Sequence, residues 1–202
     1  ILRRYFESKG NSGFYIDVGA HHPYRFSNTM LFYRLGWRGI NIDAMPRSME
    51  KFVKFRPRDI NVETGVGLFD QQKVYYSFNE PALNGFDRNL SLDRETQFEE
   101  YKIIDVKEIQ VRPLYKILTD YLPKNQKIDF MSIDVEGLDF EVLQSNDWTI
   151  FRPELVLVEK HAGDLEEILI SEINLFMKKN EYKLFAKTIN TIIYKDQQQG
   201  RV

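Results

Sequence analysis

The chain has 202 residues, of which 43% are hydrophobic and 29% are charged, with a formal net charge of −2 and no cysteine. These values suit one globular domain with a full core, and they exclude a strongly basic nucleic-acid binder, a disulfide framework and a thiolate metal site. No apolar run is long enough to span a membrane and no signal-peptide pattern is present, so we expect a cytoplasmic protein. The chain begins at Ile1 rather than Met; we expect that it is cut from a longer protein, which leaves open a lost targeting segment.

The first third of the chain alternates between helical and strand patterns. Apolar runs that stop at a glycine or an acid predict strands, and capping residues and prolines mark helix ends. In chain order, the sequence predicts a helix over 2–9, a strand at Phe14–Val18, a helix from Ser27 or Asn28 to about Leu35 that Gly36 ends, a strand over 39–44, a helix that starts at Pro46 and ends before Pro57, and a strand over 60–67.

The alternation resumes after one interruption. The sequence predicts a strand over 73–78, a polar segment over 79–102, a half-exposed strand over 103–111, a helix from Pro113 to about Tyr121, an apolar strand over 128–137, a helix over 138–145, a buried strand over 154–161, a helix over 164–179, and strands over 182–188 and 191–195. This order predicts an α/β fold with a parallel sheet covered by helices on both faces. The tight turn at Ile189–Asn190 is too short for a parallel crossover, so one of the last two strands must run antiparallel to the others.

Acidic residues collect where the predicted strands end. Ligands of open α/β sheets bind beyond the carboxyl ends of the strands, so chemistry is expected along this edge. The acids at these ends are Asp17, Asp43, Glu63, Asp134, Glu136 and Glu159. Strand interiors, in contrast, are apolar.

Gly19 and Asp43 together indicate a nucleoside ligand. A glycine directly after a strand lets a ligand approach the backbone, although an ordinary turn also uses glycine. Asp43 follows the next strand, 24 residues after Gly19, where a carboxylate can accept both ribose hydroxyl protons. Asp43 could instead cap the helix that begins at Pro46. We interpret the pair as favouring an adenosine-type ligand.

The first loop distinguishes between two cofactors. A dinucleotide needs backbone space for its pyrophosphate, but His21, His22, Pro23 and Tyr24 fill that space here. S-adenosylmethionine has no phosphate, and one glycine with several polar groups is enough to hold it. Its amino group is expected at Asp17, and its carboxylate at Asn28 or Ser27.

The fourth and fifth strand ends form a candidate catalytic floor. Asp134 and Glu136 lie two residues apart, so both side chains can point past the same sheet edge. Glu159 and His161 repeat this spacing on the neighbouring strand. Such groups suit a general base, a divalent metal site or a charged substrate. The alternative is that Asp134 caps the following helix and His161 is a loop residue.

Other prominent side chains are given structural roles. Adjacent histidines point in different directions, so His21 and His22 are expected to line or cover the pocket without sharing a metal. The basic residues Lys51, Lys54, Arg56 and Arg58 are expected on a solvated helix face. Tyr75, Tyr76, Phe78 and Phe86 are expected to pack the insert, rather than to form a substrate platform.

Several segments carry a resemblance to a known family. They are GFYIDVGAHHPYRFSNT, GWRGINIDAMP, RPRDIN, PALNGFD, IDFMSIDVEGLDFEVLQSNDW and RPELVLVE, which lie between Gly13 and Glu159. Together they resemble the FkbM family of methyltransferases. The resemblance implies a class I S-adenosylmethionine-dependent methyltransferase: a Rossmann-like three-layer sandwich whose seven-stranded sheet is mainly parallel with its last strand antiparallel. It also implies O-methylation, often of sugars in glycan, polysaccharide or natural-product biosynthesis.

The resemblance also assigns residues to parts of the cofactor. The methionine part maps onto Asp17, Gly19 and Ala20, and the ribose onto Asp43. The adenine lies near 63–66, and the transferring methyl lies near Asp134 and Glu136. With neighbouring residues from the loops, the predicted cofactor-binding set is Asp17, Gly19, Ala20, His21, Asn28, Asp43, Ala44, Glu63, Gly65, Val66 and Asp134, and the predicted catalytic set is Asp134, Glu136, Glu159 and His161. The role of His161 is our inference from its position in this chain.

The sequence therefore predicts one methyltransferase domain over 1–202, with a lid or acceptor-binding insert around 79–112. The acceptor is a small molecule or a glycan, and a divalent metal at the paired carboxylates is an additional possibility. No nucleic-acid partner is expected, and no oligomeric state is predicted. Two alternatives stay open, namely an NAD-type oxidoreductase on a similar sheet and a catalytically silent domain that binds S-adenosylmethionine.

Overall fold

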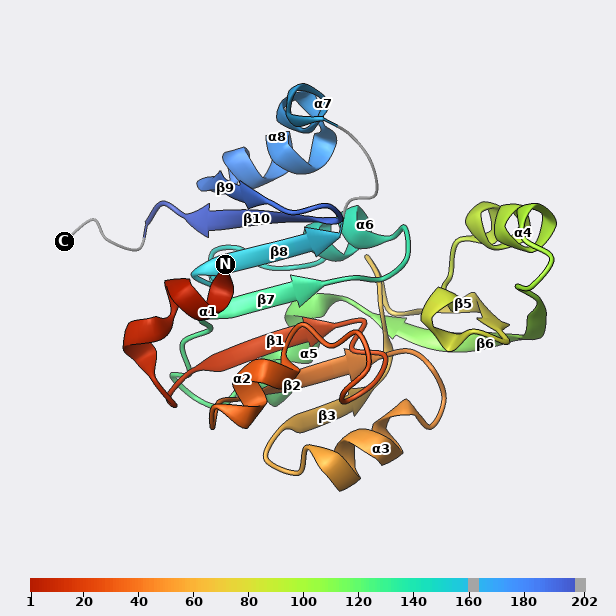
Figure 1. Ribbon diagram of the computed structural model, residues 1–202, viewed down its shortest axis with the longest axis horizontal. Helices are drawn as coiled ribbons and strands as arrows, with labels where there is room; N and C mark the ends of the chain where they lie inside the picture. The colour runs from red at the N-terminus through yellow and green to blue at the C-terminus, as the bar shows by residue number, and fades with distance from the viewer. Residues whose placement is uncertain (160–163, 199–202) are drawn as a thin grey trace.

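A seven-stranded sheet forms the centre of the computed structural model, which describes residues 1–159 and 164–198. Figure 1 shows its strands side by side in the order β3-β2-β1-β7-β8-β10-β9. Their bounds are β1 Phe14–Val18, β2 Arg38–Asp43, β3 Ile60–Glu63, β7 Phe130–Ile133, β8 Leu155–Glu159, β9 Tyr182–Lys187 and β10 Thr191–Asp196. Neighbouring strands from β3 to β8 pair in parallel, whereas β10 is antiparallel to both β8 and β9. The predicted fold class and antiparallel strand are therefore confirmed.

Helices cover both faces of this sheet and produce three layers (Figure 1). One face packs against α5 (Leu114–Tyr121), α6 (Asp139–Gln144), α7 (Leu165–Ile170) and α8 (Glu172–Lys179), and the other against α1 (Leu2–Tyr5), α2 (Met30–Arg34) and α3 (Ser48–Phe55). Alternate side chains of a strand face opposite sides, so Ile16 and Val18 join the first core while Tyr15 joins the second.

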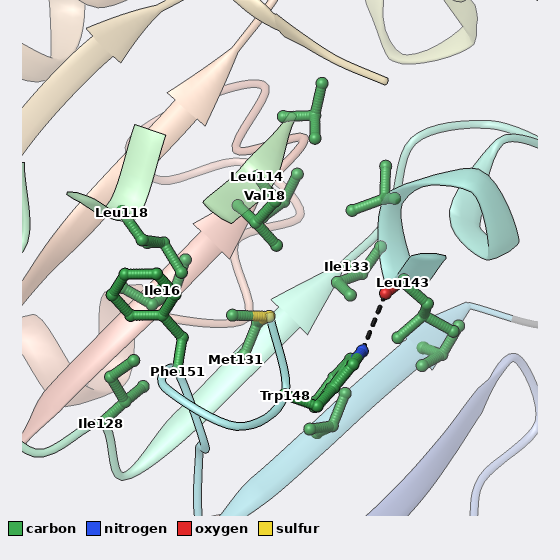
Figure 2. Packing of buried hydrophobic residues seen from close by; sticks show 14 of the residues in the cluster. Ile16, Val18, Leu114, Leu118, Ile128, Met131, Ile133, Leu143, Trp148 and Phe151 are labelled. Carbon is green, nitrogen blue, oxygen red and sulfur yellow. Dashed lines mark hydrogen bonds between the residues drawn. The ribbon is translucent and has the colours of Figure 1, made fainter. Parts of the chain in front are cut away.

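The larger core joins the sheet to α5 and α6. Figure 2 shows apolar side chains from β1, β7 and α5 meeting there, around Met131. The indole nitrogen of Trp148 donates a hydrogen bond of 2.9 Å to the carbonyl oxygen of Leu143, so this buried ring keeps its polar group satisfied. All helices in the described ranges are too short or too polar to cross a bilayer.

The predicted strand over 60–67 is divided between two sheets. After β3, Thr64 donates its backbone N–H to the Asp43 carbonyl, and β4 (Gly65–Val66) then joins a second, three-stranded sheet with β6 (Ile103–Arg112) and β5 (Gln71–Phe78). A Cβ at Gly65 would lie 2.6 Å from a methyl carbon of Val111, so the close approach of β4 to β6 requires glycine here. Figure 1 shows this second sheet beyond the carboxyl ends of the central strands.

The other differences concern helices. The polar segment over 79–102 contains α4 (Arg88–Gln97), which begins where the Asp87 carboxylate accepts the Leu90 backbone N–H. The predicted helix over 164–179 is divided at Ser171, whose extended backbone ends α7 and whose hydroxyl caps α8. The first helix is shorter than predicted, because a 3₁₀ turn at Glu7–Lys9 follows α1.

Arg56 lies in the interior and not on a solvated face, so that prediction is wrong for this residue. Its side chain is 0% exposed and forms an ion pair of 2.9 Å with Asp59. It also donates hydrogen bonds to the Tyr15 hydroxyl at 2.7 Å and to the Thr29 hydroxyl at 2.9 Å. The guanidinium thus joins the end of α3 to β1 and to the start of α2, and it fixes the base of the loop between them.

Replacing Arg56 with methionine is expected to lower the free energy of unfolding by about 3–5 kcal/mol, because Asp59 would keep a buried charge without its counterion. Urea unfolding followed by circular dichroism measures the change. Lys54→Met on the same helix is the control, since Lys54 is exposed and such a change costs less than about 0.5 kcal/mol. Equal stability of the two variants would contradict the structural role given to Arg56.

Candidate functional site

A cavity of about 390 Å³ lies beyond the carboxyl ends of β1, β2, β7 and β8. Its floor is built from the residues that follow these strands, and the insert contributes a wall over 81–86. The turn between β9 and β10 adds Asn190 and Thr191 at the rim. The size falls within the range of small-molecule sites, and the position is the one where open α/β sheets bind ligands.

Gly19 allows two strand ends to meet beneath this cavity. Its φ of +79° lies in the left-handed region, and an added Cβ would lie 1.7 Å from the backbone oxygen of Asp134. The backbone N–H groups of Gly19 and Ala20 both donate to the Ile42 carbonyl. Packing of the strand ends is therefore enough to require glycine, independently of any ligand.

Asp43 presents a buried carboxylate to the cavity. Its two oxygens accept the backbone N–H groups of His21 at 2.7 Å and Met45 at 2.8 Å. Burial raises the pKa of Asp43, and these hydrogen bonds oppose that change. Because a carboxylate has about four acceptor positions, Asp43 keeps capacity to accept hydroxyl groups from a ligand.

His21 and Asn28 line the same cavity from the loop after β1. His21 has a φ of +52°, and within the described residues its buried Nε2 has no hydrogen-bond partner. Burial is the main cause that lowers the pKa of His21, so the ring is neutral near pH 7. Asn28 donates from its amide to the Ser132 hydroxyl at 3.1 Å. A buried nitrogen without a partner is costly, so the His21 ring has capacity for a ligand hydrogen bond.

Asp134, Glu136 and Glu159 form an acidic cluster at the floor of the cavity. Each contributes a carboxylate oxygen that lies within 4.8 Å of the others. Burial is the main cause that raises the pKa of Glu159 to about 9, and the charge of Asp134 and a hydrogen bond with it add to the effect. Glu136 forms an ion pair with Arg94 of the insert. Near neutral pH, Glu159 is thus protonated and shares a hydrogen bond with Asp134.

Among the described residues, three predicted site residues lie outside the cavity lining. Asp17 is 5% exposed, accepts the Thr29 hydroxyl at 2.5 Å, and has its pKa raised to about 6 by burial. Ala20 packs against Met49 and Phe52, and Glu63 is exposed at the end of β3. His161 lies outside the described residues. The remaining predicted residues, Gly19, His21, Asn28, Asp43, Ala44, Gly65, Val66, Asp134, Glu136 and Glu159, all line the cavity.

The sequence predicts a lid or acceptor-binding insert around 79–112, but it does not identify which residues of the insert line the cavity. Pro81, Asn84 and Gly85 form a turn whose composition is a loop signal, but nothing in the sequence places this turn over the sheet edge. Tyr75 and Phe86 do pack together, with ring centroids 4.9 Å apart, and both also line the cavity. Their predicted packing role is therefore confirmed, and they contribute to the wall as well.

Comparison with protein families identifies the family to which the chain belongs. The family model described as the methyltransferase FkbM domain matches residues 17–184, which include the cavity floor, the insert and most of the C-terminal elements. The chain belongs to the FkbM methyltransferase family.

Solved structures agree with this assignment at the level of the fold. A methyltransferase FkbM from Methylobacillus flagellatus KT superposes with a TM-score of 0.53 at 15% sequence identity. The match covers 92% of this chain but 44% of that protein, so the FkbM domain described here spans less than half the length of that relative. No curated protein matches the chain.

The raised pKa of Glu159 predicts how the stability of this FkbM domain depends on pH. Because the folded protein holds a proton that an unfolded glutamic acid releases above its usual pKa of 4.5, stability is expected to fall as the pH rises towards about 9. Glu159→Gln replaces this titrating group with a neutral one. The decrease in the free energy of unfolding between pH 6 and 8 is then expected to be smaller by roughly 1 kcal/mol, a value discounted for solvent screening. Urea unfolding at both pH values measures it, and an identical pH dependence in the two proteins would count against a protonated Glu159.

Proposed function

We propose that this domain transfers a methyl group from S-adenosylmethionine to a hydroxyl group of a sugar-containing acceptor. The main support is that one cavity is lined both by the buried Asp43 carboxylate and by the cluster of Asp134, Glu136 and Glu159. The first suits a ribose and the second suits a cationic centre and a reacting hydroxyl. Membership of a methyltransferase family supports the reaction type.

The residues that line the cavity fit the parts of this cofactor. Asp43 would accept the ribose hydroxyls, and the segment Thr64–Val66 with Ala44 would lie along the adenine. The methionine part would lie over Gly19, with Asn28 at its carboxylate. Asp17, which the sequence assigns to the amino group, is hydrogen-bonded to Thr29 beneath the loop; we propose that it acts by fixing the loop.

Asp134 is the general base in this proposal. S-adenosylmethionine supplies the electrophilic methyl group on its sulfonium. The cofactor would give its methyl carbon to the acceptor oxygen and leave as S-adenosylhomocysteine, and the Asp134 carboxylate would accept the hydroxyl proton. Protonated Glu159 donates a hydrogen bond to this carboxylate and orients it, and the cavity walls align the oxygen with the methyl carbon. His161, two residues beyond Glu159, is the second candidate base from the sequence.

The insert is proposed to contact the acceptor. Residues 81–86 form one wall of the cavity, and loops at this edge of α/β sheets often determine specificity. A divalent metal at the three carboxylates would be another way to activate the hydroxyl. The NAD-type alternative lacks support in the loop after β1, where the half-buried His21 ring lines the cavity in place of a glycine-rich phosphate site.

The identity of the cofactor is tested by measuring the binding of S-adenosylhomocysteine, NAD and NADP with isothermal titration calorimetry. We expect only S-adenosylhomocysteine to bind, and Asp43→Asn to weaken its binding by at least about tenfold, because a hydrogen bond to a charged group contributes about 1.5–3 kcal/mol. Glu166→Gln, on the exposed face of α7, controls for the loss of one negative charge. Binding of a dinucleotide alone would overturn the proposal.

The role of Asp134 as the general base is tested by measuring methyl transfer to a panel of methyl glycosides and oligosaccharides. Release of S-adenosylhomocysteine gives the rate. Asp134→Asn is expected to lower kcat by about 10²–10⁴-fold, the usual contribution of general base catalysis, while cofactor binding is retained. Each assay is repeated with EDTA, since loss of activity on chelation would assign the activation of the hydroxyl to a metal ion. Full turnover by Asp134→Asn would exclude Asp134 as the base.

A further inference from the structure

Arg94 connects the insert to the acidic floor of the cavity. It lies on α4, the polar helix that the Asp87 cap starts, and its side chain is 14% exposed. One guanidinium nitrogen forms the ion pair with Glu136, and the other donates a hydrogen bond of 3.2 Å to the Leu83 carbonyl oxygen. Because Leu83 belongs to the wall and Glu136 to the floor, one side chain joins both.

The backbone around Glu136 shows that the insert packs tightly at this point. Glu136 has a φ of +55° and Gly137 a φ of +100°, so two successive residues adopt left-handed conformations. A Cβ added at Gly85 would lie 3.5 Å from the Glu136 Cβ, and one added at Gly137 would lie 3.2 Å from a Leu90 methyl carbon. A glutamate holds such a conformation only where its surroundings fix it, and here the surroundings are the insert.

The three carboxylates of the cluster have different partners. Glu136 has Arg94 as its counterion, whereas Asp134 and Glu159 share a hydrogen bond with each other. Arg94 is not among the residues that line the cavity, so its charge acts through Glu136.

We propose that Arg94 is a positioning residue that fixes the Leu83 wall and the Glu136 carboxylate relative to each other. In this way the insert completes the acceptor side of the cavity, and Glu136 is kept from competing with Asp134 for the proton or for the cofactor's positive charge. The fixed geometry rests on the contacts described, and its role in methyl transfer rests on the proposed function.

The fixed geometry is tested by hydrogen–deuterium exchange of the whole chain, followed in peptides that cover 79–87 and 134–138. We expect Arg94→Met to raise exchange in both peptides by about tenfold, the effect of losing hydrogen bonds to a charged group. Arg94→Lys keeps the positive charge but has no planar fork to reach both partners. Exchange should therefore rise in 79–87 and stay low in 134–138. Arg88→Met is the control, because Arg88 is an exposed arginine on the same helix and should change neither peptide.

The effect on charge is tested by comparing the affinities for S-adenosylmethionine, which carries a sulfonium, and S-adenosylhomocysteine, which does not. Without Arg94, Glu136 adds an uncompensated negative charge to the cavity, so Arg94→Met should shift the affinity ratio towards S-adenosylmethionine by about threefold. Arg94→Lys should restore the original ratio, and Arg88→Met should not alter it. A purely structural role would lower both affinities together.

Two results would overturn the positioning role. The first is unchanged exchange and an unchanged ratio in Arg94→Met, and the second is an equal rise of exchange in Arg94→Met and Arg88→Met, which would indicate general loosening of α4. If neither nucleoside binds to any of the proteins, the proposed function fails, and the exchange experiment still decides whether Arg94 fixes the insert.

Discussion

The burial of the Arg56 guanidinium is the constraint on which the ligand loop depends. A cation with no exposure must have partners, and those partners are Asp59, Tyr15 and the Thr29 hydroxyl. Thr29 in turn donates to Asp17 at the end of β1. The loop between β1 and α2 is therefore fixed at both ends by one polar network, and His21 and Asn28 project from it into the cavity. The cavity is built on a buried charge and not only on an apolar core.

Above this network, the acids of the strand ends are stabilised in different ways. Asp43 accepts two backbone N–H groups, Glu136 has an arginine partner, and Glu159 holds a proton. This explains how so many carboxyl groups occupy one small cavity without strong mutual repulsion, which would otherwise destabilise the fold. In the proposed function, Asp134 is then the carboxylate that accepts the proton of the acceptor.

Much of the central sheet is predictable from sequence because its signals are local. The strand Phe14–Val18 is confirmed at both ends, the left-handed Gly36 ends α2 as expected, and the short turn near Asn190 is enough to predict the antiparallel β10. The carboxyl ends of parallel strands meet at one edge, so Asp43, Asp134 and Glu159 are also found from their positions alone.

The features that were not predicted depend on contacts between distant segments. Arg56 has the spacing of a surface helix residue, and its burial depends on contacts with distant residues such as Tyr15, 41 positions away. The apolar run over 60–67 gives no sign that its last residues pair with β6 rather than β2. The polar composition of α4 resembles that of a loop. The helix depends instead on the Asp87 cap and on contacts with the turn after β7, which the sequence does not reveal.

The reversed direction of β10 has a consequence for how this scaffold could be diversified. Since β10 runs against its neighbours, its beginning rather than its end reaches the ligand edge, and the hairpin turn supplies Asn190 and Thr191 to the rim. This turn is closed by the Thr188 N–H donating to the Thr191 carbonyl at 2.8 Å, and Ile189 at its tip is 86% exposed. Because this turn lies outside the parallel strands, a change in its length or side chains acts first on the rim of the cavity, and under the proposed function such a change would alter the preference for the acceptor.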